Sequence, residues 1–240
     1  MKKPLVIITG ASSGIGKAAA IAFSKEGYPL LLIARRKELL EQLQLPEAIC
    51  AQVDVTDFES LNNAIKAAEA QYGPADLLIN NAGIMPLDKI YDQPLTDQYN
   101  LIDINIKGVL NGIHAVVNGM KERCHGTIIN VSSVAGRYTF ANHSVYCGTK
   151  YAVHAISEEI RKELGQFNVR VSVLAPAIVD TNLLTSVKNA NILASYQATK
   201  KEIDNGLKPE DLAAMMLYVY QLPQRIAIKE LVTSATNQLC

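Results

Sequence analysis

Tyr146 and Lys150 are the two residues whose types and spacing most directly suggest chemistry. They lie four residues apart in a segment of helical character, so the phenol and the ammonium share one helix face. A cation about 4 Å from a phenol, at an effective dielectric of about 20, stabilises the phenolate by about 4 kcal/mol, or about three pKa units before desolvation. The spacing therefore predicts that Tyr146 acts as an acid and base. The alternative is a pair on an ordinary solvated helix, where this spacing is frequent.

Two serines, Ser132 and Ser133, directly follow an apolar run at 127–131. If that run is a parallel strand, both hydroxyls lie at the carboxyl edge of the sheet, where such folds bind ligands. A serine hydroxyl there can donate a hydrogen bond to the carbonyl oxygen that Tyr146 protonates. The alternative role is a helix or turn cap, and the residues alone do not choose between the two serines.

A glycine-rich turn lies between the apolar run 5–8 and a helical segment of small residues. A strand, a glycine turn and a helix start point backbone N–H groups and the positive end of the helix dipole at one place, which suits a pyrophosphate. The spacing Gly-x-x-x-Gly-x-Gly departs from the commoner dinucleotide fingerprint, so a tight strand-to-helix turn is the structural alternative. The predicted contacts are Gly10, Ser12, Ser13, Gly14, Ile15 and Gly16.

Arg35 and Arg36 end the second expected strand, about twenty residues after the glycine turn, where a dinucleotide fold meets the adenine ribose. A guanidinium offers forked, charge-assisted hydrogen bonds to a 2′-phosphate, whereas a free 2′-hydroxyl calls for a carboxylate. The sequence therefore favours NADP(H) over NAD(H). The alternative is a basic pair that ends a strand and faces solvent.

Further polar and small residues follow the third and fourth expected strands. Asp54 and Val55 end the third, and Asn81, Ala82 and Gly83 follow Asn80 at the end of the fourth. Because carboxyl ends of parallel strands meet at one sheet edge, these residues are expected to line the adenine and ribose side of the cleft. Alternatively, their side chains satisfy backbone groups in turns.

Short apolar runs alternate with helical segments along the whole chain, which indicates an α/β fold. Strands are expected at 5–8, 30–34, 48–53, 77–79, 127–131, 169–174 and 230–233, and helices near 14–27, 57–72, 97–122, 145–164 and 209–221, with Thr56 and Thr96 as caps. We expect a Rossmann-like, doubly wound parallel sheet of about seven strands with helices on both faces, in a single domain over 1–240. The irregular region 176–208 is the expected substrate lid.

The bulk composition excludes several classes of partner. Basic and acidic residues both number 23 among 240 residues, so no general basic field favours nucleic acid or an anionic membrane. No apolar run is long enough to span a bilayer, and the short run near the start is better explained as a strand than as a signal peptide. The four cysteines (Cys50, Cys124, Cys147 and Cys240) and the four histidines show no metal spacing, so we expect a cytoplasmic protein without a metal.

Taken together, these motifs resemble the short-chain dehydrogenase/reductase family. The motifs in question are Thr9-Gly10-x-x-x-Gly14-Ile15-Gly16, Asn80-Asn81-Ala82-Gly83, Asn105, Ser133 and Tyr146-x-x-x-Lys150. The resemblance implies that Tyr146 exchanges the proton, that Lys150 lowers its pKa and binds the nicotinamide ribose, and that Ser133 anchors the carbonyl oxygen. It implies that Asn105 supports a proton-relaying water; the residues alone suggest a buried kink or a satisfied amide.

The resemblance has one departure. Family members usually have Pro-Gly after the sixth strand, and this chain has Pro176-Ala177; Val179 and Thr181 remain placed to meet the nicotinamide carboxamide. Within the family, Arg35, Arg36 and the end 230–238 look similar to the NADP-dependent 3-hydroxy acid (serine) dehydrogenase group. Arg137 is then either a partner for a substrate carboxylate or an exposed loop arginine.

The resemblance implies an NADP-dependent enzyme that interconverts a secondary alcohol and a ketone or aldehyde. Its substrate is either a small 3-hydroxy acid or a broader range of carbonyl compounds without a carboxylate. The alternative from another class is a non-catalytic NADP-binding regulatory protein. A homo-oligomer, a dimer or tetramer, is expected on the helices near 97–122 and 145–164.

Overall fold

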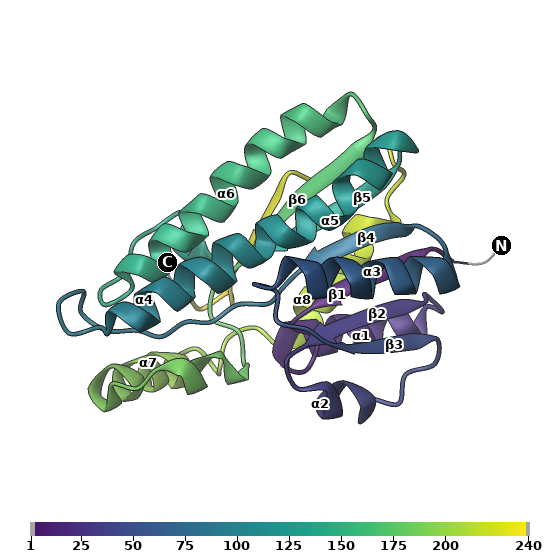
Figure 1. Cartoon of the computed structure of the whole chain (residues 1–240). Coiled ribbons are helices and arrows are strands. Elements are labelled where there is room, and N and C mark those ends of the chain that lie inside the picture. Colours follow the sequence, from purple (N-terminus) through teal and green to yellow (C-terminus); the bar gives the residue numbers. More distant parts are fainter. Residues whose placement is uncertain (1–2, 239–240) are drawn as a thin grey trace.

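The computed structural model describes residues 3–238 and contains one seven-stranded parallel sheet. The strand order is β3-β2-β1-β4-β5-β6-β7, so the order reverses between β1 and β4 (Figure 1). The strands are β1 (Leu5–Thr9), β2 (Leu30–Ala34), β3 (Ala48–Gln52), β4 (Ala75–Asn80), β5 (Gly126–Val131), β6 (Val169–Pro176) and β7 (Glu230–Thr233). The expected doubly wound Rossmann-like sheet is confirmed.

The helices are α1 (Gly14–Lys25), α2 (Lys37–Glu41), α3 (Phe58–Tyr72), α4 (Leu95–Ile102), α5 (Gly108–Glu122), α6 (Ser144–Gly165), α7 (Ala190–Glu202) and α8 (Pro209–Gln221). Helices cover both faces of the sheet, with α1 and α8 on one face and α3, α5 and α6 on the other (Figure 1). Alternate residues of β1 point to opposite faces of the sheet: Val6 and Ile8 pack with α1 and α8, and Leu5 and Ile7 pack with α3, α5 and α6. This alternation explains why the central strands read as continuous apolar runs.

A third, smaller core lies outside these layers, beneath the region expected to be the lid. Met85, Leu101 and Tyr146 form part of it, and Leu184 and Tyr196 from the lid region pack against it. The lid region is more regular than the sequence indicated, because α7 forms there. Asn189 caps α7 by accepting hydrogen bonds from two backbone N–H groups of its first turn.

All seven expected strands and the five expected helices are present, with two differences in how helices begin. Asp57, and not Thr56, caps α3, and its carboxylate accepts from the Ser60 N–H at 3.2 Å. Thr96 lies inside α4, which begins at Leu95 after Pro94. A carboxylate satisfies the free N–H groups of a helix start and favours the positive end of the dipole, so Asp57 displaces the neighbouring threonine.

The expected helix near 97–122 is divided by a π-helical segment, Asp103–Lys107, which contains the buried Asn105. Such single-turn interruptions of a helix are frequent at functional sites. The segment joins α4 to α5 without a break in the chain's helical path.

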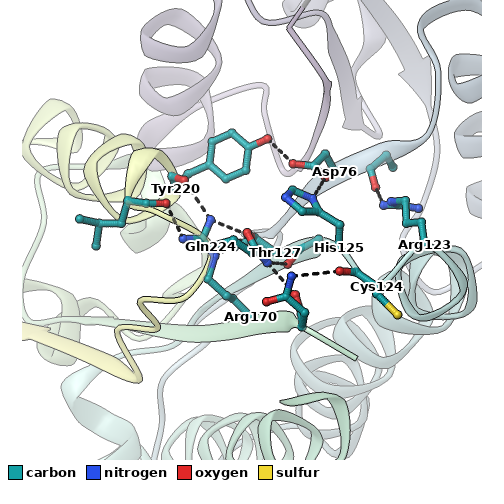
Figure 2. A network of polar contacts seen from close by, with 12 residues as sticks. Asp76, Arg123, Cys124, His125, Thr127, Arg170, Tyr220 and Gln224 are labelled. Atoms are coloured by element: carbon teal, nitrogen blue, oxygen red, sulfur yellow. Dashed lines mark hydrogen bonds and ion pairs between the residues drawn. The ribbon is translucent and has the colours of Figure 1, made fainter. Parts of the chain in front are cut away.

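A buried polar network ties the amino-terminal end of the sheet to α8 (Figure 2). The Arg170 guanidinium on β6 donates to Thr127 Oγ1 and to the backbone carbonyls of Tyr220 and Leu222. A cation at the carboxyl end of a helix stabilises its dipole. The Tyr220 hydroxyl donates to Asp76 at 2.6 Å, and His125 contacts the other oxygen of that carboxylate. The network lies at the edge opposite the strand carboxyl ends. It therefore stabilises the fold away from the edge at which a parallel sheet binds ligands.

Among residues 3–238, no helix is long and apolar enough to cross a membrane. The same residues contain no group of three or more His, Cys, Asp or Glu side chains that could hold a metal ion. Cys240 lies outside the described residues.

Candidate active site

A cavity of about 890 Å³ opens at the carboxyl edge of the sheet, where the strand order reverses. This is the size and the place at which an open α/β sheet takes a ligand. Of the predicted site residues, the cavity is lined by Gly10, Ser12, Ser13, Gly14, Ile15, Arg35, Arg36, Asp54, Val55, Asn81, Ala82, Gly83, Ser133, Tyr146, Lys150, Pro176, Val179 and Thr181. Gly16 and Asn105 are not in its lining and lie directly behind it.

The glycine turn between β1 and α1 is packed too closely for side chains. Gly10 has φ +65°, and a Cβ there would lie 2.8 Å from the Ala82 Cα. A Cβ at Gly16 would lie 2.5 Å from both the Gly10 carbonyl oxygen and the Asn81 amide nitrogen. The Asn81 amide donates to the carbonyls of Thr9 and Gly10 at 3.0 and 3.2 Å, which fixes the turn. Gly16 therefore shapes the turn from behind.

The start of α1 has the properties that an anion requires. Ser13 is its N-cap, the Ser13 side chain makes no capping hydrogen bond, and the first turn contains no acidic residue. The first N–H groups of a helix have no partner within the helix, so they and the dipole are available to a phosphate. The Arg36 guanidinium reaches 3.5 Å from the Ser12 hydroxyl, which brings the end of β2 to the same loop. These residues fit the diphosphate and 2′-phosphate of NADP(H).

Two other predicted cofactor contacts are partly occupied by local hydrogen bonds. Asp54 Oδ1 accepts from the N–H and the hydroxyl of Thr56 at 2.9 and 2.8 Å. Thr181 Oγ1 accepts from the Leu183 N–H at 3.3 Å and caps a short 3-10 turn. Both residues line the cavity, so Asp54 combines the turn role and the lining role that the sequence left as alternatives, and Thr181 has a turn role that the sequence did not indicate.

The departure at Ala177 has a simple structural explanation. Ala177 is not among the described residues with positive φ, and its N–H donates to the Thr233 carbonyl at 2.8 Å. The backbone there does not need glycine, so alanine is accommodated without strain.

Ser133 and Tyr146 lie side by side in the cavity lining. Ser133 follows β5, and its hydroxyl donates to the Pro176 carbonyl at 3.3 Å and accepts from the Ala135 N–H at 3.1 Å. Burial raises the pKa of the Tyr146 phenol well above its usual value, and a hydrogen bond with Ser133 opposes that rise. Ser132 is directed elsewhere, because its hydroxyl donates to the Lys150 carbonyl at 3.2 Å. The geometry thus favours Ser133.

Lys150 is a buried cation beneath the phenol ring. Its ammonium lies 5.7 Å from the centre of the Tyr146 ring and donates to the Val131 carbonyl at 3.1 Å. Burial lowers the pKa of Lys150 to about 8. The acidified Tyr146 expected from the sequence is wrong for this structure, because desolvation dominates and raises the pKa of the phenol. The phenol is therefore protonated at neutral pH, which is the form that donates a proton.

Asn105 is a satisfied amide, held between the loop after β4 and α6. Its Oδ1 accepts from the Ile84 N–H at 3.0 Å, and its Nδ2 donates to the Ile84 carbonyl and to Thr149 Oγ1 at 3.1 and 3.2 Å. A Cβ at Gly83 would meet Asn105 Oδ1 at 3.2 Å and Lys150 Nζ at 3.9 Å. Asn105 and Lys150 thus face the same small space beside Gly83.

The substrate end of the cavity is lined by residues that the sequence did not single out for binding. The apolar and aromatic side chains and one histidine come from the loop after β4, the 3-10 turn after β5, the segment between that turn and α6, and the lid: Ile84, Met85, Val134, Phe140, His143, Leu183, Leu184, Ile192 and Tyr196. Polar side chains of the same segments also line the cavity: Asn142, Asn182, Thr185, Ser186, Ser195, Thr199 and Glu202. Because they belong to loops and to a helix that the sequence did not predict, no spacing pattern connects them. The predicted lid at 176–208 was the one available signal.

Arg137 is not part of the cavity lining and pairs with Glu230 of β7. Its Nε lies 2.9 Å from Glu230 Oε1, and the other Glu230 oxygen contacts its terminal nitrogen. His154 Nε2 lies 3.0 Å from the same Glu230. The suggestion that Arg137 binds a substrate carboxylate is wrong, because its charge is already matched within the chain.

Comparison with known proteins gives a consistent result. The profile of the family described as short chain dehydrogenase matches residues 4–192. An uncharacterized oxidoreductase of Staphylococcus saprophyticus is 37% identical, with 99% of this chain and 98% of the relative covered. An uncharacterized oxidoreductase of Listeria monocytogenes is 36% identical over 99% of this chain and 98% of the relative.

Solved structures agree with these sequence relatives. The closed form of a serine dehydrogenase complexed with NADP⁺ superposes with a TM-score of 0.88 at 30% identity, covering 98% of this chain and 96% of that chain. A 3-ketoacyl-(acyl-carrier-protein) reductase from Brucella melitensis complexed with NADH has a TM-score of 0.87 at 25% identity, covering 98% of both chains.

Proposed function

The chain belongs to the short-chain dehydrogenase family and is an oxidoreductase, and from this premise we propose that it interconverts secondary alcohols and carbonyl compounds with NADP(H). The observation that carries the proposal is the meeting of Ser133, Tyr146 and Lys150 in the same cavity as the glycine turn. A protein that only binds a dinucleotide needs the turn but has no use for a buried phenol over a buried ammonium. The non-catalytic alternative therefore has the weaker support.

In this proposal Ser133 and Tyr146 bind the carbonyl oxygen of the substrate, and Tyr146 donates the proton that makes it a hydroxyl. NADPH, when bound, supplies the hydride to the carbonyl carbon. The phenol is protonated at neutral pH and so has a proton to give, whereas burial raises its pKa and opposes the transfer. The Lys150 ammonium lowers the free energy of the phenolate that remains on Tyr146 after the proton has left. Asn105 is held by its hydrogen bonds to Ile84 beside Lys150.

A preference for NADP(H) over NAD(H) is supported by the two guanidinium groups at the end of β2. Arg35 and Arg36 line the cavity, and Arg36 lies beside Ser12 of the glycine loop. A 2′-phosphate there would receive charge-assisted hydrogen bonds, whereas a 2′-hydroxyl would leave both cations without an anion. The structural relatives bind NADP⁺ or NADH, so the preference rests on these residues.

The substrate end supports carbonyl compounds without a carboxylate. Among the described lining residues, the only Lys or Arg side chains are Arg35, Arg36 and Lys150, of which two belong to the cofactor end and the third lies beneath Tyr146. A substrate carboxylate there would give up part of its hydration and gain no cation in return. The competing candidate is a small 3-hydroxy acid, favoured by the likeness to serine dehydrogenase.

The experiment is an NADPH oxidation assay with aldehydes, aryl ketones and diketones, together with the reverse reaction on a 3-hydroxy acid and its methyl ester. We expect turnover of neutral ketones, and a methyl ester that is oxidised at least as well as the free acid. A free acid that reacts much faster than its ester would select the hydroxy-acid candidate. No turnover of any carbonyl compound would overturn the proposal.

A further inference from the structure

A histidine that lines the cavity, His143, has one ring nitrogen without a hydrogen-bond partner among the described residues. Its Nδ1 lies 2.6 Å from the Ala141 carbonyl oxygen. A carbonyl oxygen only accepts, so Nδ1 carries the proton and Nε2 is left as an acceptor. No hydrogen bond joins Nε2 to any residue within 3–238. His143 lines the cavity, and burial lowers its pKa, which keeps the ring neutral.

A second polar group without a partner stands opposite, on the lid helix. Tyr196 of α7 lines the same cavity, and its ring centre lies 6.3 Å from that of His143. Its hydroxyl makes no hydrogen bond within the part of the chain described. Burial raises the pKa of Tyr196 to about 12, so the phenol is a stable donor. Both side chains are half-buried in the cavity wall, so a ligand that fills the cavity would remove their access to water and would have to satisfy both groups.

These two groups lie beside the reacting centre. The His143 ring centre is 6.1 Å from that of Tyr146, and the Tyr196 phenol is close enough to raise the Tyr146 pKa electrostatically. A substrate group between His143 and Tyr196 would therefore belong to a carbon close to the carbonyl. It would have to donate to Nε2 and accept from the Tyr196 hydroxyl.

We propose that His143 and Tyr196 form a polar subsite for a hydroxyl group on the carbon skeleton of the substrate, one or two carbons from the carbonyl. The inference rests on the proposed carbonyl chemistry at Tyr146 and narrows its substrate class to hydroxy ketones with an apolar remainder. A hydroxyl both donates and accepts, as the two groups require. An ammonium or carboxylate would be desolvated among Met85, Leu184 and Ile192, which pack in the same small core.

The test uses two pairs of ketones that differ by one hydroxyl: 1-phenylpropan-2-one with its 1-hydroxy derivative, and 4-phenylbutan-2-one with its 4-hydroxy derivative. We expect the hydroxyl to raise kcat/KM about tenfold or more in one of the pairs, mainly through a lower KM. Tyr196→Phe, which removes one oxygen and keeps the ring, and His143→Phe should each bring that ratio close to one. His143→Gln, which restores an acceptor, should recover part of it.

Phe140→Leu is the matched control, because the ring centre of Phe140 lies 5.8 Å from that of His143 and the side chain has no polar group. This substitution should change kcat/KM by the same factor for both ketones of a pair. Binding is measured separately, by titrating each ketone into the NADPH-loaded Tyr146→Phe variant, which should not consume the cofactor, and following the fluorescence of the nicotinamide. A hydroxyl advantage that is absent in both pairs, or that persists in Tyr196→Phe and His143→Phe, overturns the inference. Ketones that bind with the expected ratio but never oxidise NADPH would overturn the proposed function and leave the subsite standing.

Discussion

The ammonium of Lys150 lies 5.7 Å from the centre of the Tyr146 ring, one turn further along α6, and both side chains are buried. Among the described residues, no carboxylate pairs with this ammonium; its hydrogen bond goes to the Val131 carbonyl. A buried cation without a counter-ion is costly for the fold. Its presence beneath a candidate proton donor is best explained by catalysis, and this explanation has consequences for stability.

Lys150→Met should stabilise the protein while removing activity. The pKa of Lys150 is lowered from 10.5 to about 8, and at about 1.36 kcal/mol per pKa unit the charge costs the fold about 3 kcal/mol at neutral pH. The unfolded chain binds more protons between pH 8 and 10.5, so this cost fades as the pH rises through that window. In urea unfolding, Lys150→Met should therefore have a higher free energy of unfolding than the parent at pH 7, and this difference should shrink by pH 10.

The control for this prediction is Lys66→Met, at an exposed lysine of α3. It should change the free energy of unfolding little at either pH. A Lys150→Met protein that is less stable than the parent at pH 7 would show that the buried charge does not destabilise the fold.

Arg36→Ala should weaken the binding of NADPH more than the binding of NADH. Arg36 reaches the Ser12 hydroxyl at the glycine loop, and the loss of a charge-assisted hydrogen bond to a phosphate costs about 1.5–3 kcal/mol, or about 10- to 100-fold in KM. The neighbouring Lys37→Ala is the control, since Lys37 pairs with Glu41 and lies outside the cavity lining. Equal losses for both cofactors would argue against a 2′-phosphate site at Arg36.

Gly16→Ala should disrupt the cofactor loop. The added methyl would lie 2.5 Å from the Gly10 carbonyl and the Asn81 amide, and overpacking of this kind costs about 1–3 kcal/mol. The matched variant is Gly148→Ala on α6, where a Cβ meets nothing within 4 Å. Gly16→Ala should lower both the melting temperature and the affinity for NADPH, and Gly148→Ala should lower neither. A Gly16→Ala protein that binds NADPH normally would contradict the assigned role of the turn.

How far the sequence predicts this structure differs between the sheet and the cavity. Strand positions and the parallel order follow from short apolar runs such as Leu30–Ala34, which are buried on both faces. The glycine turn follows from residue type, because close approach to Ala82 leaves no alternative to glycine at Gly10. These features depend on local sequence or on burial, which a single chain reveals.

The remainder depends on contacts between segments far apart in the sequence. Arg137 looked free to bind a carboxylate because its partner Glu230 lies 93 residues away. The pKa of Tyr146 depends on burial beneath the lid, and α7 is weakly amphipathic, so its sequence gave no helical signal. Nothing in the sequence around His143 indicates a binding role, because its position in the cavity wall depends on the fold.

Exposed apolar side chains on α4, α5 and α6 support the expected homo-oligomer. They include Tyr99, Ile102, Leu110 and Tyr151, each more than 40% exposed. We predict that light scattering of the purified protein gives a dimer or tetramer, and that Ile102→Glu combined with Leu110→Glu shifts it toward the monomer, because charges at an apolar interface are desolvated on association. A parent protein that is monomeric at micromolar concentration would contradict this prediction.

The most direct test of the proposed chemistry is NADPH oxidation by Tyr146→Phe on the best neutral ketone, with NADPH affinity measured in parallel. The substitution removes one hydroxyl from a ring that stays packed in the small core beneath the lid. The account predicts that kcat falls by at least about 100-fold, the usual worth of a positioned general acid, while NADPH still binds within about twofold of the parent affinity. An unchanged kcat would contradict the account, because the proton would then come from another group.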